Sequence, residues 1–430
     1  MRILNALLLV MIVYATYESH YSLDLGLKGL NLVNLMFVAV VAMLIAKRVH
    51  ADTPAPAKGY FIFLFVMLAL AFLVGEIRDT TTFVDDLSSL KNSIFYMLFY
   101  FVFYHAARDL KTIRLLFAGI LLVVFLVSLQ GMRQALDYGI TSFSESRRVS
   151  GPFGADFHSA NQVAAYYVTF IPVLAAVALF CKSRPFVRLF ALGCTALAIM
   201  ALFFTYSRQA YFSIALLMIY VAIRRNLVLG AAVIVAILNY GAWVPQSVVD
   251  RVVMTEQKDE VGNARLDEST ESRFEIWSGA GQLIAHNPWG IGLNHFKREI
   301  GQFAPTYSNM DAHNIFVLTM TEAGLGGIVA LALLMFALFR LGRSVQLLDD
   351  REETKILGHG YTAAVAAVVL SNLYGSRFFD GNVMANFWML SGIVARYYTM
   401  TLETRSTEKA ASSAKAGEPL TAIAPVGVPR

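Results

Sequence analysis

Long apolar runs recur along the whole chain, and they constrain its fold more than any other feature of the sequence. Each run is about 17–25 residues long, the length that lets a helix cross the hydrocarbon core of a bilayer. The chain is 57% hydrophobic and 15% charged, whereas roughly a quarter of a soluble domain is charged. We therefore predict an all-α polytopic membrane protein with about twelve transmembrane helices, near residues 3–17, 29–46, 59–77, 91–107, 113–130, 160–181, 187–205, 208–223, 226–244, 313–340, 356–374 and 382–400.

Positive charges gather in every second connection between these runs. Lys and Arg cluster near residues 47–58, 108–114, 182–188, 224–225 and 340–355. Because cytoplasmic loops carry an excess of Lys and Arg, we expect this set and both termini to face the cytoplasm. The first run is interpreted as an uncleaved span, since no small-residue cleavage site follows it. The loop bias explains the net charge of +5 and requires no nucleic-acid partner.

One outward connection, residues 245–312, is far longer than the others. Its 68 residues are too many for a plain connector, so we expect it to be folded or functional. A capping box at Ser272 and Glu275 predicts a helix that ends near Asn287-Pro288. This helix either seals the loop against the bundle or guides substrate. The predicted organisation is helices 1–9 in residues 1–244, the loop, helices 10–12 in 313–404, and a disordered cytoplasmic tail over 405–430.

Arginines on the outer side run against the charge bias of the loops. A guanidinium presents a planar fork of donors that matches phosphate oxygens and stays charged, so several together suit a diphosphate. Structural interpretations compete with this one. Arg208 could snorkel to headgroups, Arg147 and Arg148 could pair with nearby acids, and we expect Arg377 to pair with Asp380. The candidates for binding a diphosphate are Arg147, Arg148, Arg208, Arg265 and Arg273.

His313 is the candidate for proton transfer. The stretch Asp311–Phe316 returns the large loop to the membrane and sets this histidine at the lip of a hydrophobic helix. An imidazole, with a pKa of about 6.5, suits general-base work, and Asp311 or Asn314 can orient the ring. A helix-capping histidine is the alternative interpretation, and His158 is the competing candidate.

The carboxylates do not form an evident metal site. No Asp-x-Asp pair lies in an outer loop, and Asp85-Asp86 are adjacent residues that we expect to be solvated. Glu322 lies nine residues after His313, which on a continuous helix is about 13 Å deeper and roughly half a turn round. We therefore interpret Glu322 as structural.

Four motifs in this order resemble the shared pattern of the O-antigen ligase and Wzy polymerase superfamily. They are Thr205-Tyr-Ser-Arg208, Ser272-Arg-Phe-Glu-Ile-Trp277, Asn287-Pro-Trp-Gly-Ile-Gly292, and His313-Asn314 followed by Glu322-Ala-Gly-Leu-Gly-Gly327. The resemblance implies a GT-C-like glycosyltransferase in which His313 is the essential histidine. It also implies that Arg208 and one large-loop arginine, either Arg265 or Arg273, are essential.

The resemblance implies an activity at the periplasmic face of the bacterial inner membrane. Members use glycans linked through diphosphate to undecaprenol: ligases of the WaaL type transfer them to lipid A–core, completing lipopolysaccharide, and polymerases extend the glycan. Ligases are expected to be inverting, metal-independent and without cofactor. We favour the ligase, because the chain lacks the additional C-terminal region of the protein-glycosylating relatives, and the polymerase stays the alternative.

The chemistry of the residues agrees with this expectation. A glycosyl diphosphate already carries a good leaving group, whose developing charge arginines can stabilise, and His313 can accept the proton of the acceptor hydroxyl. A transporter of the same lipid-linked glycan would instead place ionisable residues near the bilayer midplane. Since the notable charges cluster at the outer edge, an enzyme is favoured over a transporter.

Overall fold

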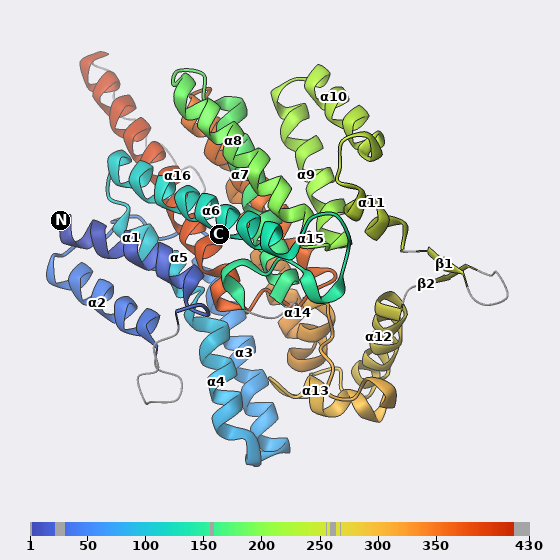
Figure 1. Ribbon diagram of the computed structural model, residues 1–430. Helices are drawn as coiled ribbons and strands as arrows, with labels where there is room; N and C mark the ends of the chain where they lie inside the picture. The colour runs from blue at the N-terminus through green and yellow to red at the C-terminus, as the bar shows by residue number, and fades with distance from the viewer. Residues whose placement is uncertain are drawn as a thin grey trace.

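The computed structural model describes residues 2–21, 31–154, 159–254, 256–258, 264–266 and 268–416, and its regular structure is almost entirely helical (Figure 1). The first helices are α1 (Arg2–Tyr17), α2 (Leu32–Ala46), α3 (Lys58–Arg78), α4 (Phe83–Phe95), α5 (Leu98–Ala106), α6 (Leu110–Tyr138), α7 (Ala160–Phe180) and α8 (Pro185–Phe203). The later helices are α9 (Arg208–Arg225), α10 (Leu227–Leu238), α11 (Gln246–Val253), α12 (Glu268–His286), α13 (Phe296–Glu299), α14 (Ile315–Gln346), α15 (Glu352–Asn372) and α16 (Gly381–Ala416). A small antiparallel sheet pairs β1 (Glu256–Lys258) with β2 (Ala264–Leu266).

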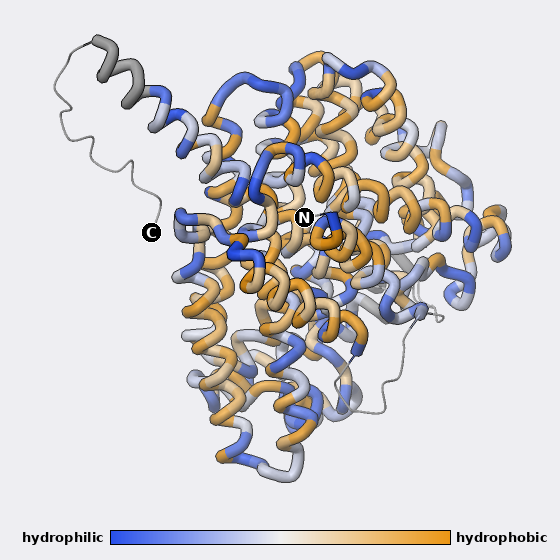
Figure 2. Tube along the Cα trace, turned by 90° about the vertical axis from the view of Figure 1, so that its left-hand side faces the viewer, coloured by the Kyte–Doolittle hydropathy of each residue, from blue (hydrophilic) through white to orange (hydrophobic). Residues whose placement is uncertain are grey.

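Five of the described helices are long and apolar enough to cross a membrane, namely α3, α6, α7, α8 and α14. Apolar residues dominate the helices, and hydrophilic residues gather in the connections (Figure 2). The prediction of an all-α membrane protein is thus confirmed. The run expected over 91–107 is divided between α4 and α5. The count of twelve spans and the GT-C-like fold stay predictions.

Helix α7 is the centre of the bundle. It is 94% buried over a membrane-length window, and it packs against α8, α9 and α15. The backbones of α7 and α15 approach closely at Gly360, where a Cβ would lie 3.3 Å from the Cα of Val173. Small residues permit such contacts where lipid supplies no hydrophobic drive between helices. Because α7 begins and α15 ends on the side predicted to face outward, their contact fixes that end of the bundle.

The predicted large loop contains α11, the β1–β2 sheet, α12 and α13. Helix α12 begins at Glu268, four residues before the predicted capping residue Ser272, so that predicted start is wrong. The helix ends at His286, directly before Asn287-Pro288, as the ring of a proline requires. One face of α12 packs against the rest of the loop in a small separate core, made of Ile276, Ala280, Phe296, Ile300, Ala304 and Ala312.

Residues 288–293, which we call the inserted segment, enter a break in α14. The break lies at Gly324, where φ is 64° and ψ is −164°. Carbonyls and amides freed by a break at membrane depth must find partners inside the protein. Main-chain bonds supply them, from Leu325 N to Pro288 O (3.2 Å), from Ile291 N to Thr321 O (3.0 Å), from Gly292 N to Glu322 O (3.1 Å), and from Leu293 N to Ala71 O of α3 (3.1 Å).

Glycines make this insertion possible. Gly290 has φ +96°, and a Cβ there would lie 2.4 Å from the carbonyl oxygen of Glu322. A Cβ on Gly324 would lie 2.4 Å from the carbonyl carbon of Trp289. Both positions exclude a side chain for two reasons: φ is positive, and another backbone segment occupies the place of the Cβ. The glycines of two distant motifs therefore serve one junction.

Helix α16 continues through Ala416, which differs from the disorder predicted from residue 405 onward. Arg405 of this helix is tied to the connection between α14 and α15, because its Nη2 lies 3.3 Å from Asp349 Oδ2. Within the same helix, Arg396 Nη1 lies 3.0 Å from Glu403 Oε1. Residues 417–430 of the predicted tail lie outside the described residues.

The insertion predicts that Gly324→Ala destabilises the protein by about 2 kcal/mol or more, since the backbone conformation is restricted to glycine and the site has no free space. Gly281→Ala in α12 is the control, because a Cβ there meets nothing within 4 Å. Thermal unfolding of the two detergent-purified variants measures the difference. Equal midpoints for both variants would contradict the role of the break.

Candidate functional site

One pocket is lined by His313 and residues from α7, α9, α12 and the end of α15, and we call it the His313 pocket. Arg273 of α12 and Arg377, in the turn after α15, line it together with His313. Its remaining lining is polar or small, with Asn161, Ser207, Gln209, Ser371, Tyr374 and Gly375 among the residues. The structure thus brings the predicted histidine and one predicted arginine together.

Two contacts hold α12 and the start of α14 at this pocket. The indole Nε1 of Trp277 donates to the carbonyl oxygen of Ala312 at 2.8 Å, next to His313. The amide of Ile315 donates to the carbonyl of Gly375 at 3.1 Å, which joins the first residue of α14 to the turn that carries Arg377. The positions of the histidine and both arginines therefore depend on each other.

His313 lies just before α14 with φ +50°, a conformation uncommon for a residue with a side chain. Asn314, one of the two residues predicted to orient the ring of His313, caps the helix, since its Oδ1 accepts from the amides of Phe316 and Val317 at 2.9 and 3.2 Å. Asp311 Oδ2 lies 3.7 Å from the Nδ1 of His313, whose side chain is 33% exposed. The imidazole is therefore not the helix cap, and its ring is free to face the pocket.

The surroundings of His313 keep its imidazole neutral at pH 7. Burial is the main cause that lowers the pKa of His313 below its ordinary value, and the carboxylate of Asp311 opposes it. The positive charges of Arg273 and Arg377 add to the lowering. A neutral imidazole next to cations can accept a proton, whereas a protonated one cannot.

Arg377 is a residue that the sequence reasoning set aside. It does pair with Asp380, with Nη1 3.1 Å from Oδ2, as predicted, yet it also lines the His313 pocket. Its buried Nε makes no hydrogen bond to any residue that the structure describes. The signal for it was its outer-side position against the charge bias. The predicted ion pair with Asp380 accounts for only part of Arg377, because a guanidinium has five donors and the others can face the pocket.

Arg148 does not line the His313 pocket but bonds residues that hold it in place. Its side chain is 8% exposed, and its three nitrogens donate to Thr205 O (2.9 Å), Glu145 Oε1 (2.7 Å) and Asn161 Oδ1 (2.8 Å). Asn161 lines the pocket, and Thr205 precedes α9. Arg148 therefore joins three segments and positions pocket residues, while its neighbour Arg147 is exposed.

Arg208 and Gln209 begin α9 and face different sides of it. Gln209 lines the His313 pocket and donates to the carbonyls of Leu370 and Ser371 at 3.0 and 2.9 Å. Arg208 instead lines a groove of about 590 Å³ between α8, α9, α10 and α11, which we call the α9–α10 groove. Among the described residues lining it, Arg208 is the one charged side chain, and most of the others are apolar.

The remaining candidates lie partly outside the described residues. Arg265 is in β2, where it is the backbone partner of Gln257 in β1, and its side chain is outside the described part. The same holds for the whole of His158. Of the two large-loop candidates, Arg265 and Arg273, the structure describes the side chain of Arg273, and it lines the His313 pocket.

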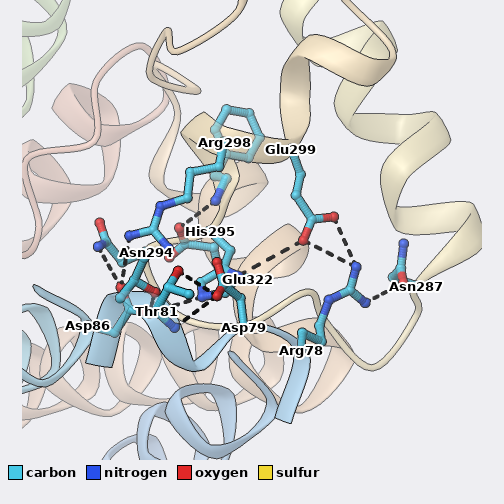
Figure 3. Close-up of polar contacts among 12 residues, drawn as sticks. Arg78, Asp79, Thr81, Asp86, Asn287, Asn294, His295, Arg298, Glu299 and Glu322 are labelled. Atoms are coloured by element: carbon cyan, nitrogen blue, oxygen red, sulfur yellow. Dashed lines mark hydrogen bonds and ion pairs between the residues drawn. The ribbon is translucent and has the colours of Figure 1, made fainter. Parts of the chain in front are cut away.

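A second polar cluster, missed from the sequence, lies where α4, α13 and the inserted segment meet (Figure 3). The predicted solvation of Asp86 is wrong: its side chain is 1% exposed and lies 3.0 Å from Nε2 of His295. Asn294 and Arg298 also bond this carboxylate, at 2.8 and 3.3 Å. The partners are more than 200 residues away in sequence, so no local pattern indicates them.

The cluster holds Asp86 ionised. Burial by itself would raise the pKa of this carboxyl, but hydrogen bonds from Thr82, Asn294 and His295 outweigh burial and lower it. Glu322 lies nearby and accepts from the amide of Phe296 at 3.1 Å, a structural role in keeping with the interpretation from sequence. Across the described residues, no three His, Cys, Asp or Glu side chains are grouped as metal ligands.

Comparison with known families gives one match. Residues 193–332 match the family model of the O-antigen ligases. The matched region runs from α8 into α14 and includes Arg208, Arg273 and His313. No curated protein matches the chain. The match supports an enzyme of the ligase or polymerase type that acts on lipid-linked glycans.

The geometry predicts that replacement by lysine lowers stability at Arg148 but not at its neighbour Arg147. Arg148→Lys leaves buried acceptors unpaired, because one ammonium cannot reach three separate oxygens, and should cost about 2 kcal/mol of stability. Arg147→Lys is the matched control and should change nothing, since that side chain is exposed. Thermal unfolding of both variants tests this. A larger loss for Arg147→Lys would refute the supporting role of Arg148.

Proposed function

We propose that this protein, whose residues 193–332 match the O-antigen ligase family model, belongs to the O-antigen ligase and Wzy polymerase superfamily and is an O-antigen ligase of the WaaL type. It would transfer a glycan from undecaprenyl diphosphate to a sugar hydroxyl of lipid A–core at the periplasmic face of the bacterial inner membrane. The observation that carries the proposal is the His313 pocket, in which a half-buried imidazole and two guanidinium groups share one polar cavity.

The donor would bind through its charge and its lipid. The α9–α10 groove is mostly apolar, and Arg208 is the charged residue among its described lining. A polyprenyl chain in this groove would bring its diphosphate to Arg208, at the N-terminal end of α9, where backbone amides also favour an anion. Arg273 and Arg377 line the His313 pocket, which Gln209, the neighbour of Arg208, also lines. Positive charge therefore extends from the groove to the reacting centre.

The reaction then follows from the positions of the groups. The acceptor hydroxyl oxygen attacks the anomeric carbon from the face opposite the diphosphate, which inverts that carbon. The bond from the anomeric carbon to the diphosphate oxygen breaks with its electron pair, and undecaprenyl diphosphate leaves. Asp311 faces Nδ1 of His313, so Nε2 is the nitrogen that accepts the acceptor's proton. The arginines stabilise the charge that grows on the leaving oxygen.

Transfer by purified protein tests the proposal. With undecaprenyl-diphosphate glycan and lipid A–core in the presence of EDTA, we expect glycosylated lipid A–core as the product. His313→Ala should reduce the rate about 10²–10⁴-fold, the usual contribution of a general base. His50→Ala, at an exposed histidine in the α2–α3 connection, is the control and should keep full activity.

Two outcomes would count against the ligase. A ladder of lengthened glycans formed without any core acceptor would identify a polymerase instead. Retention of full transfer by His313→Ala would remove the general base from the mechanism, whichever acceptor is used.

The pH dependence gives an independent prediction. Because burial lowers the pKa of His313, wild-type activity should persist below pH 6.5, a histidine's usual pKa, and fall as the pH drops through the lowered value. Asp311 raises that pKa, so Asp311→Asn should shift the acidic limb of the kcat/KM profile to lower pH. An unchanged limb would show that the limb reports another group.

A further inference from the structure

A third cavity, separate from the His313 pocket and the α9–α10 groove, lies at the outer end of α3. It has a volume of about 440 Å³, and it is lined by α3, the C-terminal part of α12, and α13 with its following turn. We call it the α3–α13 pocket. None of the candidate site residues lines it, and the proposed reaction leaves it without a role.

One wall of this pocket is a fixed polar network (Figure 3). Arg78, the last residue of α3, donates to Asn287 Oδ1 at 3.0 Å and to both oxygens of Glu299 at 3.1 and 3.0 Å. His295 and Arg298 are held by the buried carboxylate of Asp86. Side chains fixed by each other in this way form a preorganised surface, so a ligand would not have to order them.

The chemistry of the lining suits a saccharide. The pocket presents cationic donors, carboxylate acceptors, and the amides of Asn287 and Gln302, which both donate and accept. The rings of His286 and Phe303 lie at its edge with centroids 5.5 Å apart, and they offer an apolar surface. A phosphate alone would meet Asp79 and Glu299 as well as the arginines. Hydroxyl groups both donate and accept, so a neutral sugar can use both signs of charge.

The location of the pocket indicates a saccharide that is attached to a lipid. Helix α3 is long enough to cross the membrane and only 28% buried over a membrane-length window. It exposes Val66, Leu70 and Leu73, each by 47–53%, along the face that leads to Arg78. A lipid beside α3 would therefore raise its first sugars to the mouth of the pocket.

Helix α12 connects this pocket to the reacting centre. Arg273 near its start lines the His313 pocket, and His286 at its end lines the α3–α13 pocket. Thirteen residues of helix separate the two, which is about 20 Å. An oligosaccharide can span that distance. The donor groove is on α8–α11, away from α3 in Figure 1, so a second lipid-borne substrate has its own approach.

We propose that the α3–α13 pocket binds core sugars of the lipid-borne acceptor and holds it so that its terminal hydroxyl reaches His313. The proposal rests on the ligase function above, and it adds a specificity site for the acceptor that is remote from the chemistry. The donor occupies the α9–α10 groove and does not enter this pocket.

Steady-state kinetics with matched glutamine variants test the proposal. Gln302→Ala removes an exposed pocket amide, whereas Gln282→Ala removes an exposed amide of α12 that does not line the pocket. We expect Gln302→Ala to raise the KM for lipid A–core about five-fold, the effect of one lost hydrogen bond. Its kcat and its KM for the donor should stay unchanged, as should every constant of Gln282→Ala. Gln302→Trp fills the cavity and should abolish binding of delipidated core oligosaccharide, measured calorimetrically without donor.

The outcomes separate this inference from the ligase function. If the wild type transfers no glycan to lipid A–core, the ligase function fails. If the wild type is active and Gln302→Trp keeps the wild-type KM for the acceptor, the pocket proposal fails and the function stands. A raised KM for the donor in place of the acceptor would assign the pocket to the donor glycan, and it would also overturn the proposal.

Discussion

The insertion of residues 288–293 into the break of α14 is the constraint on which the two pockets along α12 depend. Four main-chain hydrogen bonds join this segment to α14 and α3, and they supply partners for backbone groups that the break leaves without helical ones. The segment connects α12 to α13, so the junction sets where α12 lies against α14 and thereby how Arg273 faces His313. It also brings His295 to Asp86. One backbone junction thus determines the geometry of both pockets.

The role of each arginine depends on whether its side chain is enclosed by acceptors or faces a cavity. Arginines that are enclosed by acceptors, such as Arg148, hold segments together, because a buried guanidinium without partners would be costly. Arginines that face a cavity, such as Arg273 and Arg377, act on the pKa of His313. The same residue type therefore supports the site in one place and forms it in another, and the number of acceptors within reach decides between the two roles.

Much of the fold followed from the sequence, because apolar length and loop charge are local properties. The helices lie where the apolar runs are, and the histidine at the start of α14 lines a pocket with Arg273, as their motif suggested. The sequence did not show that Arg148 is enclosed, that Arg377 lines the same pocket, or that Asp86 is buried. Each depends on partners distant in the chain, such as the 208 residues between Asp86 and Asn294. Spacing along the chain contains no information about such pairs.

By itself the sequence determined that the chain is a helical membrane protein, and it supplied the predictions of which side carries the polar loop and which residues hold a diphosphate or move a proton. These conclusions rest on the solvent preference of each segment and on side-chain chemistry. Only the tertiary structure decided which candidates meet. Arg208 and Gln209 are neighbours in sequence, yet one faces an apolar groove and the other the His313 pocket. Successive residues on a helix point about 100° apart, so packing alone assigns each to its cavity.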